Sequence, residues 1–273
     1  MKTTRIYAML ALLLMAGGVT MKAQELNEIF WSPDSWVYSM MFEDEHTFVA
    51  NRTIVDQYSN VAEIQFVRMT DEGEELASQR LFSQEEYAEK VWMSPLQRLP
   101  DGGLALFYAS RVDGIATFYR VDLNDDLSFT IIQLEWETDD YYDSDATFYP
   151  YNTGVVVNKD GSAIITYPPH SQYHLNGTEA MQFLKFDDKG HLVGQRLMEG
   201  YRGQDRHHTL PAPDSLGCRI ILRSNGSPKL DCYTLDADLN TIAVKENVEE
   251  LSWPYQCCRF AYLETNPANG KTY

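Results

Sequence analysis

Residues 158–167, NKDGSAIITY, combine an Asp-Gly turn signal with an apolar strand, and residues 99–108, LPDGGLALFY, nearly repeat them. Asp-Gly between hydrophobic runs is a strong short-range signal for a β-hairpin. Related segments occur at FEDEHTFVA and APDSLGCRIIL, and the four aligned aspartates are Asp44, Asp101, Asp160 and Asp214. Their steps of 57, 59 and 54 residues indicate an internal repeat in which each copy forms one structural unit.

A second hairpin signal follows each of these turns. The segments are FVRMTDEGEEL from Phe66, FYRVDLNDDLSF from Phe118, FLKFDDKGHLV from Phe183 and CYTLDADLNTI from Cys232. Each is an alternating apolar strand that breaks at Asp, Gly or Asn and then resumes, as a hairpin does. Each unit is therefore predicted to be a four-stranded antiparallel meander. Beyond the amino-terminal stretch, only QEEYAEKVW from Gln84 predicts a short helical turn.

Four-stranded units repeated at a near-constant step resemble the blades of a β-propeller. The sequence thus predicts an all-β protein with four complete blades and a truncated fifth, at residues 31–82, 89–136, 147–198, 205–250 and 251–273. β-Sandwich domains are the alternative, but they do not account for the constant step. The turn motifs fit no single propeller family, because the Gly-His and Trp-Asp marks of WD repeats are missing.

The amino terminus has the pattern of a secretory signal peptide. Lys2 and Arg5 precede an apolar stretch at 8–15, and small residues lead to a cleavage site after Ala23. The apolar stretch is too short to span a bilayer, and no later segment is long and apolar enough to do so. We therefore expect residues 1–23 to be removed and residues 24–273 to form a propeller domain that is secreted or displayed on the cell surface.

The signal peptide, the acidic aromatic-rich repeats and the lack of a lipid-anchor cysteine resemble secreted or surface propeller proteins of Bacteroidota-type bacteria. In such proteins a carboxy-terminal sorting domain commonly follows the propeller. The fifth unit here contains WPYQCCRFAYLETNPANGKTY and stops inside a blade, and an open ring would leave sheet edges exposed. We therefore expect a fragment of a longer chain; the alternative is a five-bladed ring whose last blade is completed by residues 25–35.

The chain is strongly acidic. Its formal net charge is −18, and the mature chain is more acidic still because Lys2, Arg5 and Lys22 lie in the signal peptide. A protein that binds nucleic acid needs a basic surface, whereas this one would repel polyanions and anionic lipid. Nucleic acid is therefore excluded as a partner, and a glycan or an extracellular protein is expected.

Aromatic residues recur at or just before the predicted first strand of each unit. Because the innermost strands of a propeller line its channel, these positions are expected at the channel mouth, the usual ligand site. Large rigid rings there would suit stacking on sugars or on aromatic peptide groups. The predicted ligand-binding residues are Trp36, Trp92, Tyr149, His207 and Trp253. The alternative is that these rings pack between neighbouring blades.

Acidic residues recur beside the aromatic positions, at Asp34, Glu89, Asp145, Asp205 and Glu250. Converging carboxylates serve as acid, base or nucleophile in glycoside hydrolysis. A propeller glycosidase that uses Asp34, Asp145 and Asp205 is therefore the alternative function, and a purely structural surface protein is the third. A binding module without catalytic residues is the primary hypothesis, because the order and context of a glycosidase's acids are not recognisable here.

No cofactor is expected. The acidic turns DLNDD, DDYYDSD and DADLN offer oxygen ligands of the kind that Ca²⁺ binds, but they do not complete an EF-hand loop, so solvated turns are expected. Around the predicted Asn225-Gly226 turn, Cys218 and Cys232 are about three positions out of opposition, which is poor disulfide geometry. A bridge from one of them to Cys257 or Cys258, or buried thiols, are the alternatives.

Overall fold

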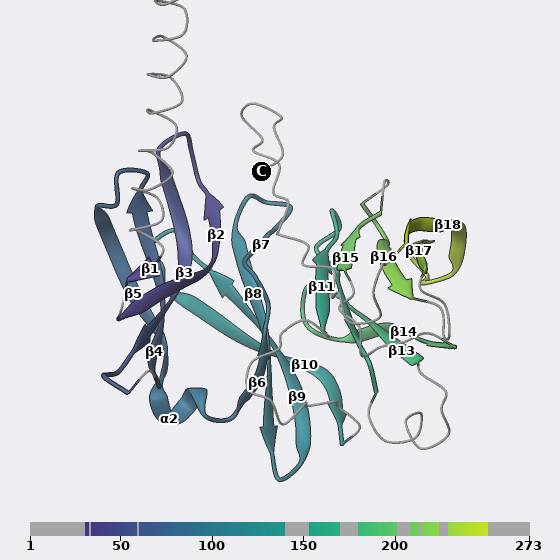
Figure 1. Ribbon diagram of the computed structural model, residues 1–273, viewed down its shortest axis with the longest axis horizontal. Coiled ribbons are helices and arrows are strands. Elements are labelled where there is room, and N and C mark those ends of the chain that lie inside the picture. The colour runs from purple at the N-terminus through teal and green to yellow at the C-terminus, as the bar shows by residue number, and fades with distance from the viewer. Residues whose placement is uncertain are drawn as a thin grey trace, which may run out of the picture. The chain divides into compact units, whose positions relative to one another are not determined.

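The computed structural model describes residues 31–32, 34–58, 60–139, 153–169, 180–200, 208–212, 215–223 and 229–250. Within these ranges the chain is almost entirely β, in four antiparallel sheets that follow one another in sequence (Figure 1). The chain divides into two compact units, residues 1–87 and 88–273. No helix in the described part is long and apolar enough to cross a membrane.

The first unit contains one five-stranded sheet. Its strands are β1 (Trp31–Ser32), β2 (Ser35–Phe42), β3 (Thr47–Val55), β4 (Val61–Thr70) and β5 (Glu75–Ser83), paired in that order. The helical turn expected from Gln84 is confirmed as α2 (Gln84–Tyr87). It begins with a capping box, in which the backbone N–H of Ser83 donates to Glu86 at 2.8 Å and the Glu86 N–H donates to Ser83 Oγ at 3.4 Å.

The second unit contains three sheets. The strands of the second sheet are β6 (Lys90–Met93), β7 (Gln97–Arg98), β8 (Leu104–Val112), β9 (Ile115–Leu123) and β10 (Phe129–Thr138). The third sheet has β11 (Gly154–Val157), β12 (Ala163–Tyr167), β13 (Ala180–Phe186) and β14 (Leu192–Glu199). The fourth has β15 (His208–Pro211), β16 (Cys218–Arg223), β17 (Lys229–Leu235) and β18 (Thr241–Glu250).

The predicted fold class is confirmed: the protein is all-β and is built of four-stranded antiparallel β-propeller blades. Each sheet is a meander whose neighbouring strands are consecutive in the chain, except that both β6 and β7 pair with β8. The first sheet gains the short β1, and the second divides its first strand into β6 and β7. The partial fifth blade expected at 251–273 lies outside the described residues.

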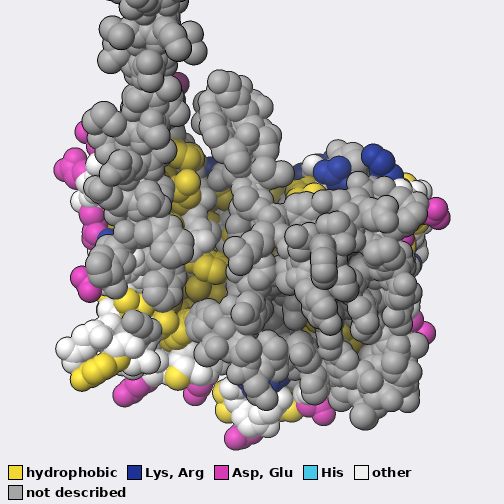
Figure 2. All heavy atoms as spheres, in the orientation of Figure 1, with side chains coloured by type: hydrophobic (Ala, Val, Ile, Leu, Met, Phe, Trp, Pro, Cys, Tyr) yellow, Lys and Arg dark blue, Asp and Glu magenta, His cyan; other side chains and the backbone are white. Residues whose placement is uncertain are grey.

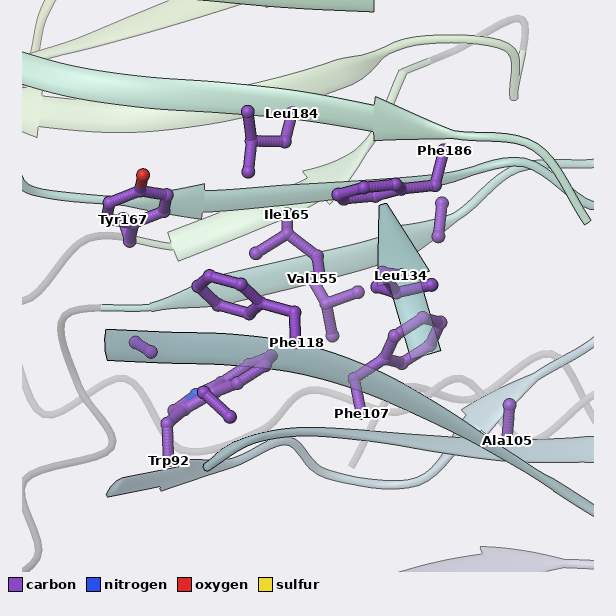
Figure 3. Close-up of a cluster of buried hydrophobic side chains, with 13 residues drawn as sticks. Trp92, Ala105, Phe107, Phe118, Leu134, Val155, Ile165, Tyr167, Leu184 and Phe186 are labelled. Atoms are coloured by element: carbon purple, nitrogen blue, oxygen red, sulfur yellow. The ribbon is translucent and has the colours of Figure 1, made fainter. Parts of the chain in front are cut away.

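Apolar side chains fill the space between successive sheets of the second unit. Phe107, Phe118 and Leu134 of the second sheet pack with Ile165 and Phe186 of the third (Figure 3). A second cluster joins the third and fourth sheets and includes Phe183, Met198, Ile220, Leu235 and Leu239. Sheets packed face to face in this way bury their apolar residues without a helical layer.

Each sheet has two unlike ends, because its strands are antiparallel. Here the four strands of each blade are counted without β1, and with β6 and β7 as one strand. The connections from first to second strand and from third to fourth strand then share one end, which we call the turn end. The connection from second to third strand and the start of the first strand share the other, the loop end. In the second unit the turn ends of adjacent blades touch, since the backbone N–H of Lys159 donates to the Ser215 carbonyl at 2.9 Å.

Candidate functional site

The first strands of the third and fourth blades lie against each other. A β-carbon added to Gly154 would stand 2.3 Å from Thr209 Oγ1 and 2.9 Å from Thr166 Oγ1. The two threonine hydroxyls are 2.7 Å apart and share a hydrogen bond. The close approach requires glycine at this position. It brings the loop ends of two blades together, as a propeller does around its axis.

Trp92, a predicted ligand-binding residue, lies in the core. Its side chain is 4% exposed, and its ring meets Phe118 edge-on, with centroids 6.2 Å apart (Figure 3). Phe118 in turn packs on Tyr167 at 5.5 Å, so the ring of Trp92 belongs to the contact between the second and third blades. Trp92 therefore packs between neighbouring blades, as the alternative interpretation predicts, and it offers no free ring face to a ligand.

The side chains of the other predicted aromatic residues lie outside the described part. Trp36 lies in β2 opposite Trp31, but its side chain is not among those described. Tyr149, His207 and Trp253 lie outside the described residues.

Among the acids of the glycosidase hypothesis, only Asp34 is described. It is exposed just before β2, and its carbonyl oxygen accepts a hydrogen bond from the N–H of Val55 at 2.9 Å. The structure gives its carboxylate no hydrogen bond or ion pair with any described residue. Asp145 and Asp205 lie outside the described ranges.

Carboxylates in the acidic turns hold the turns together. Asp126 accepts hydrogen bonds from Ser128 Oγ at 2.6 Å and from the Ser128 N–H at 2.9 Å, which lower its pKa. Asp236 likewise accepts from the N–H groups of Asn240 and Asp238, at 2.8 and 3.0 Å. The described residues contain no group of three His, Cys, Asp or Glu side chains arranged to hold a metal ion. Most of the DDYYDSD turn lies outside them.

The described cysteines are not paired with each other. Cys232 stands opposite Ile221 in the β16–β17 ladder, three residues from Cys218, as the turn predicted. Burial raises the pKa of the Cys218 thiol to about 12, so this thiol is not a nucleophile near neutral pH. Cys257 and Cys258 lie outside the described residues.

Cationic side chains of one blade bind carbonyl groups at the turn end of the next. Arg120 Nη1 donates to the Gly161 carbonyl at 3.3 Å, and Lys185 Nζ donates to the Ala237 carbonyl at 2.8 Å. Arg196 donates to the Leu239 carbonyl. These three cations are therefore engaged in contacts between blades.

Sequence reasoning missed the most exposed large hydrophobic side chain of the described residues. Tyr58 is 75% exposed and lies in the turn between β3 and β4, at the loop end of the first blade. Its signal is an aromatic residue inside the otherwise polar turn DQYSN. The predicted binding residues lie at or just before the starts of first strands, whereas Tyr58 lies in a turn between the second and third full-length strands.

Acidic groups predominate on the surface, as the net charge of −18 requires. On the face drawn in Figure 2, Asp and Glu side chains are visible at several separate places among the described atoms, and Lys and Arg at few. Such a surface favours ligands that carry no negative charge.

No known protein family model matches the chain, and no curated protein matches it in sequence. Solved structures similar to it include the acylaminoacyl peptidase of Pyrococcus horikoshii, at 12% identity over 80% of this chain and 33% of that one, with a TM-score of 0.47. The β-propeller domain of the Trilobed protease from Pyrococcus furiosus has 11% identity over 81% of this chain and 59% of that one, with a TM-score of 0.44. TolB from Acinetobacter baumannii has 13% identity over 76% of this chain and 42% of that one, with a TM-score of 0.42.

The chain thus spans between 33% and 59% of the length of these three structures. At these identities and TM-scores the likenesses carry no argument about activity or ligand.

Proposed function

We propose that the protein is an exported binding module, secreted or held at the cell surface, that engages a glycan or a protein through the loop end of its blades. The observation that carries this proposal is the difference between the two ends. At the turn end of the second unit, Arg120, Lys185 and Arg196 bind carbonyl groups of the neighbouring blade. That end is occupied by contacts that hold the blades together.

The loop end has the features of a working surface. The longest connections of the second unit, from β10 to β11 and from β12 to β13, join strands at this end. Connections on a rigid scaffold carry binding residues more often than the scaffold does. The contact of Gly154 with Thr209 brings two loop ends together, so that a single ligand can meet both.

Three carboxylates of the described turns are unsuited to the acid role in glycoside hydrolysis. A glycosidase needs one carboxylic acid whose pKa is raised so that it donates a proton. Asp44, Asp126 and Asp236 have instead a lowered pKa, because hydroxyl and N–H groups of their own turns donate to them. The hydrolase alternative depends on Asp34, Asp145 and Asp205, and it requires two of their carboxyl groups to converge.

A binding assay with paired surface variants tests the proposal. The mature chain is applied to immobilised polysaccharides and extracellular-matrix proteins, beside the double variant Val112→Ser and Ile115→Ser. These two exposed residues pair across the β8–β9 hairpin at the loop end. Val193→Ser is the matched control, because Val193 is 57% exposed near the turn end of β14.

The expected result is binding that the loop-end variant weakens and the control leaves intact. A well-folded protein that binds none of the probes would contradict the proposal and favour a structural role. Loss of binding in Val193→Ser alone would place the contact elsewhere. Export is tested separately by amino-terminal sequencing of protein recovered outside the cell, which should begin at Gln24.

A further inference from the structure

Two turns meet at the loop end of the first blade. One precedes β2 and contains Asp34, and the other joins β3 to β4 and contains Tyr58. The N–H of Val55, the last residue of β3, donates to the Asp34 carbonyl at 2.9 Å, and Ser35 stands opposite Ile54 in the ladder. Asp34 and Tyr58 therefore belong to one end of one sheet.

The turn that carries Tyr58 is fixed without help from the aromatic ring. Asp56 Oδ1 accepts hydrogen bonds from the N–H groups of Tyr58 at 2.8 Å and Asn60 at 2.9 Å. The Asp56 N–H donates to the Asn60 carbonyl at 2.9 Å, and Asn60 Nδ2 donates to Asp56 Oδ2 at 3.2 Å. Tyr58 as a whole is 75% exposed. Neither the turn nor the core accounts for an aromatic residue here.

Asp34 is not one of the aspartates that mark the repeat, and it differs from them. Asp101 and Asp160 each accept an N–H from a residue of their own turn, at 3.0 Å. The Asp34 carboxylate is exposed and has no such partner among the described residues. It is therefore available to accept hydrogen bonds from a ligand, and hydrogen bonds to a charged acceptor are stronger than those between neutral groups.

We propose that Tyr58 and Asp34 form a contact for a neutral polysaccharide at the loop end of the first blade. The phenol ring offers a rigid face for the C–H surface of a sugar ring, at little entropy cost. The Asp34 carboxylate accepts hydrogen bonds from sugar hydroxyl groups. The ligand is neutral because Asp34, Asp56 and the net charge of −18 repel acidic polymers. The inference rests on the proposed function and names its ligand class.

Native affinity electrophoresis tests this contact. The mature chain is run in gels that contain xylan, laminarin or galactomannan, with polygalacturonate as the acidic comparator. We expect retardation by a neutral polymer and none by polygalacturonate. Tyr58→Ala should raise the dissociation constant about ten-fold, whereas Tyr58→Phe should leave it nearly unchanged because the ring is kept. Asp34→Asn should weaken binding several-fold.

The matched control is Ile242→Ala, which removes an apolar side chain that is 61% exposed on β18 of the other unit. It should bind as the original chain does. Equal retardation of the original chain, Tyr58→Ala and Asp34→Asn would overturn this inference and leave the proposed function standing, with the ligand at the loop end of another blade. No retardation by any neutral polymer, or retardation by polygalacturonate alone, would also overturn it. A protein ligand for the loop end would then remain to be found with the array of matrix proteins.

Discussion

The turns that join the last two strands of the third and fourth blades have the same backbone hydrogen bonds, but they differ in the side chain at the fourth turn position. In the third blade the Asp187 N–H donates to the His191 carbonyl at 3.0 Å, and the Gly190 N–H donates back to Asp187 at 3.2 Å. In the fourth blade Asp236, Leu239 and Asn240 repeat this pattern at 2.9 and 3.1 Å. The fourth turn position has a positive φ in both, 91° at Gly190 and 64° at Leu239.

The neighbouring blade explains why one turn has glycine and the other leucine. A β-carbon on Gly190 would stand 3.0 Å from the Gln133 carbonyl and from Ile132 Cγ2 on β10. Leu239 instead buries its side chain between the third and fourth blades, and its Cδ1 would lie 3.8 Å from a β-carbon on Gly194 of β14. In the third blade the turn has the small residue, Gly190, and the facing strand has the large one, Ile132. In the fourth blade the turn has the large residue, Leu239, and the facing strand has the small one, Gly194.

The exchange shows how repeated blades keep one turn geometry while their contacts differ. A leucine at positive φ costs roughly 1–2 kcal/mol of backbone strain, and burial of its side chain contributes roughly 1.5–3 kcal/mol. Leucine is therefore tolerated where a pocket receives it. At the same turn position the second blade also has a buried leucine, Leu127, with a φ of 66° and an exposure of 1%. The first blade has a glycine there, Gly73, with a φ of 90°.

The largest effect is expected when the residue of the fourth turn is placed in the third. Gly190→Leu adds backbone strain of roughly 1–2 kcal/mol and overpacking against β10 of roughly 1–3 kcal/mol. We expect the free energy of unfolding to fall by about 4 kcal/mol in urea denaturation followed by tryptophan fluorescence. A loss below about 1 kcal/mol would show that β10 yields and that the packing difference does not decide the residue.

The reverse change should cost less. Leu239→Ala removes buried methyl groups but keeps a side chain at positive φ, so we expect a loss of about 3 kcal/mol. Leu239→Gly removes one more carbon yet relieves the strain, so its loss should be about 1 kcal/mol smaller. Urea denaturation of both variants measures the difference. A Gly variant less stable than the Ala variant would contradict the strain at Leu239.

A methyl group added to Gly194, the strand residue that faces Leu239, should be tolerated. A β-carbon on Gly194 would lie at ordinary van der Waals distances, 3.6 Å from Lys185 Cβ and 3.8 Å from Leu239 Cδ1. Gly194→Ala should therefore be neutral or stabilising by up to about 0.5 kcal/mol. Gly102→Ala is the matched control: no atom lies within 4 Å, but its φ is 93°, so strain alone should cost about 1 kcal/mol. Equal losses in both variants would contradict this distinction.

Much of this fold could be predicted from the sequence, because local chemistry determines the turns. Asp160 accepts hydrogen bonds from Ser162 within its own five-residue turn, so an aspartate that marks the repeat also stabilises the turn. Leucine at position 127 or 239 gives no such signal. Positive φ is normally marked by Gly or Asn, and the cluster that buries Leu239 includes residues far away in the chain, such as Phe183 and Met198.

The candidate site was less predictable for a similar reason. Trp92 was expected to face the channel mouth, but the β6–β8 ladder has a register shift between Lys90 and Trp92. A bulge reverses the alternation of side chains along a strand, so counting from the start of the strand does not give the orientation of the ring. Tyr58 could have been found by asking which turn contains an aromatic residue that its hydrogen bonds do not need.

The smallest effect expected concerns pH and again separates the two turns. The third turn ends in His191, whose Nδ1 lies 2.9 Å from Asp187 Oδ2 and whose Nε2 lies 3.9 Å from Glu135 Oε1 of β10. The hydrogen bond to Asp187 and the charges of Asp187 and Glu135 raise the pKa of His191 above 6.5, and burial and Lys189 oppose them. The fourth turn has Asn240 at this position, which does not titrate.

Because the folded pKa of His191 is raised, its contribution to stability is complete below the unfolded value near 6.5 and is lost as pH rises through the folded value. His191→Asn copies the fourth turn and should remove this part of the pH dependence while keeping a side-chain hydrogen bond to Asp187. The measurement is the urea midpoint of both proteins from about pH 5.5 to 8.5, with an NMR titration of the His191 ring.

His46, paired with Asp71 at 3.1 Å in the first unit, also has a raised pKa and titrates in both proteins, so only the difference between them reports on His191. Identical slopes across neutral pH would mean that solvent and salt screen this exposed pair completely, and that the third and fourth turns differ in packing alone.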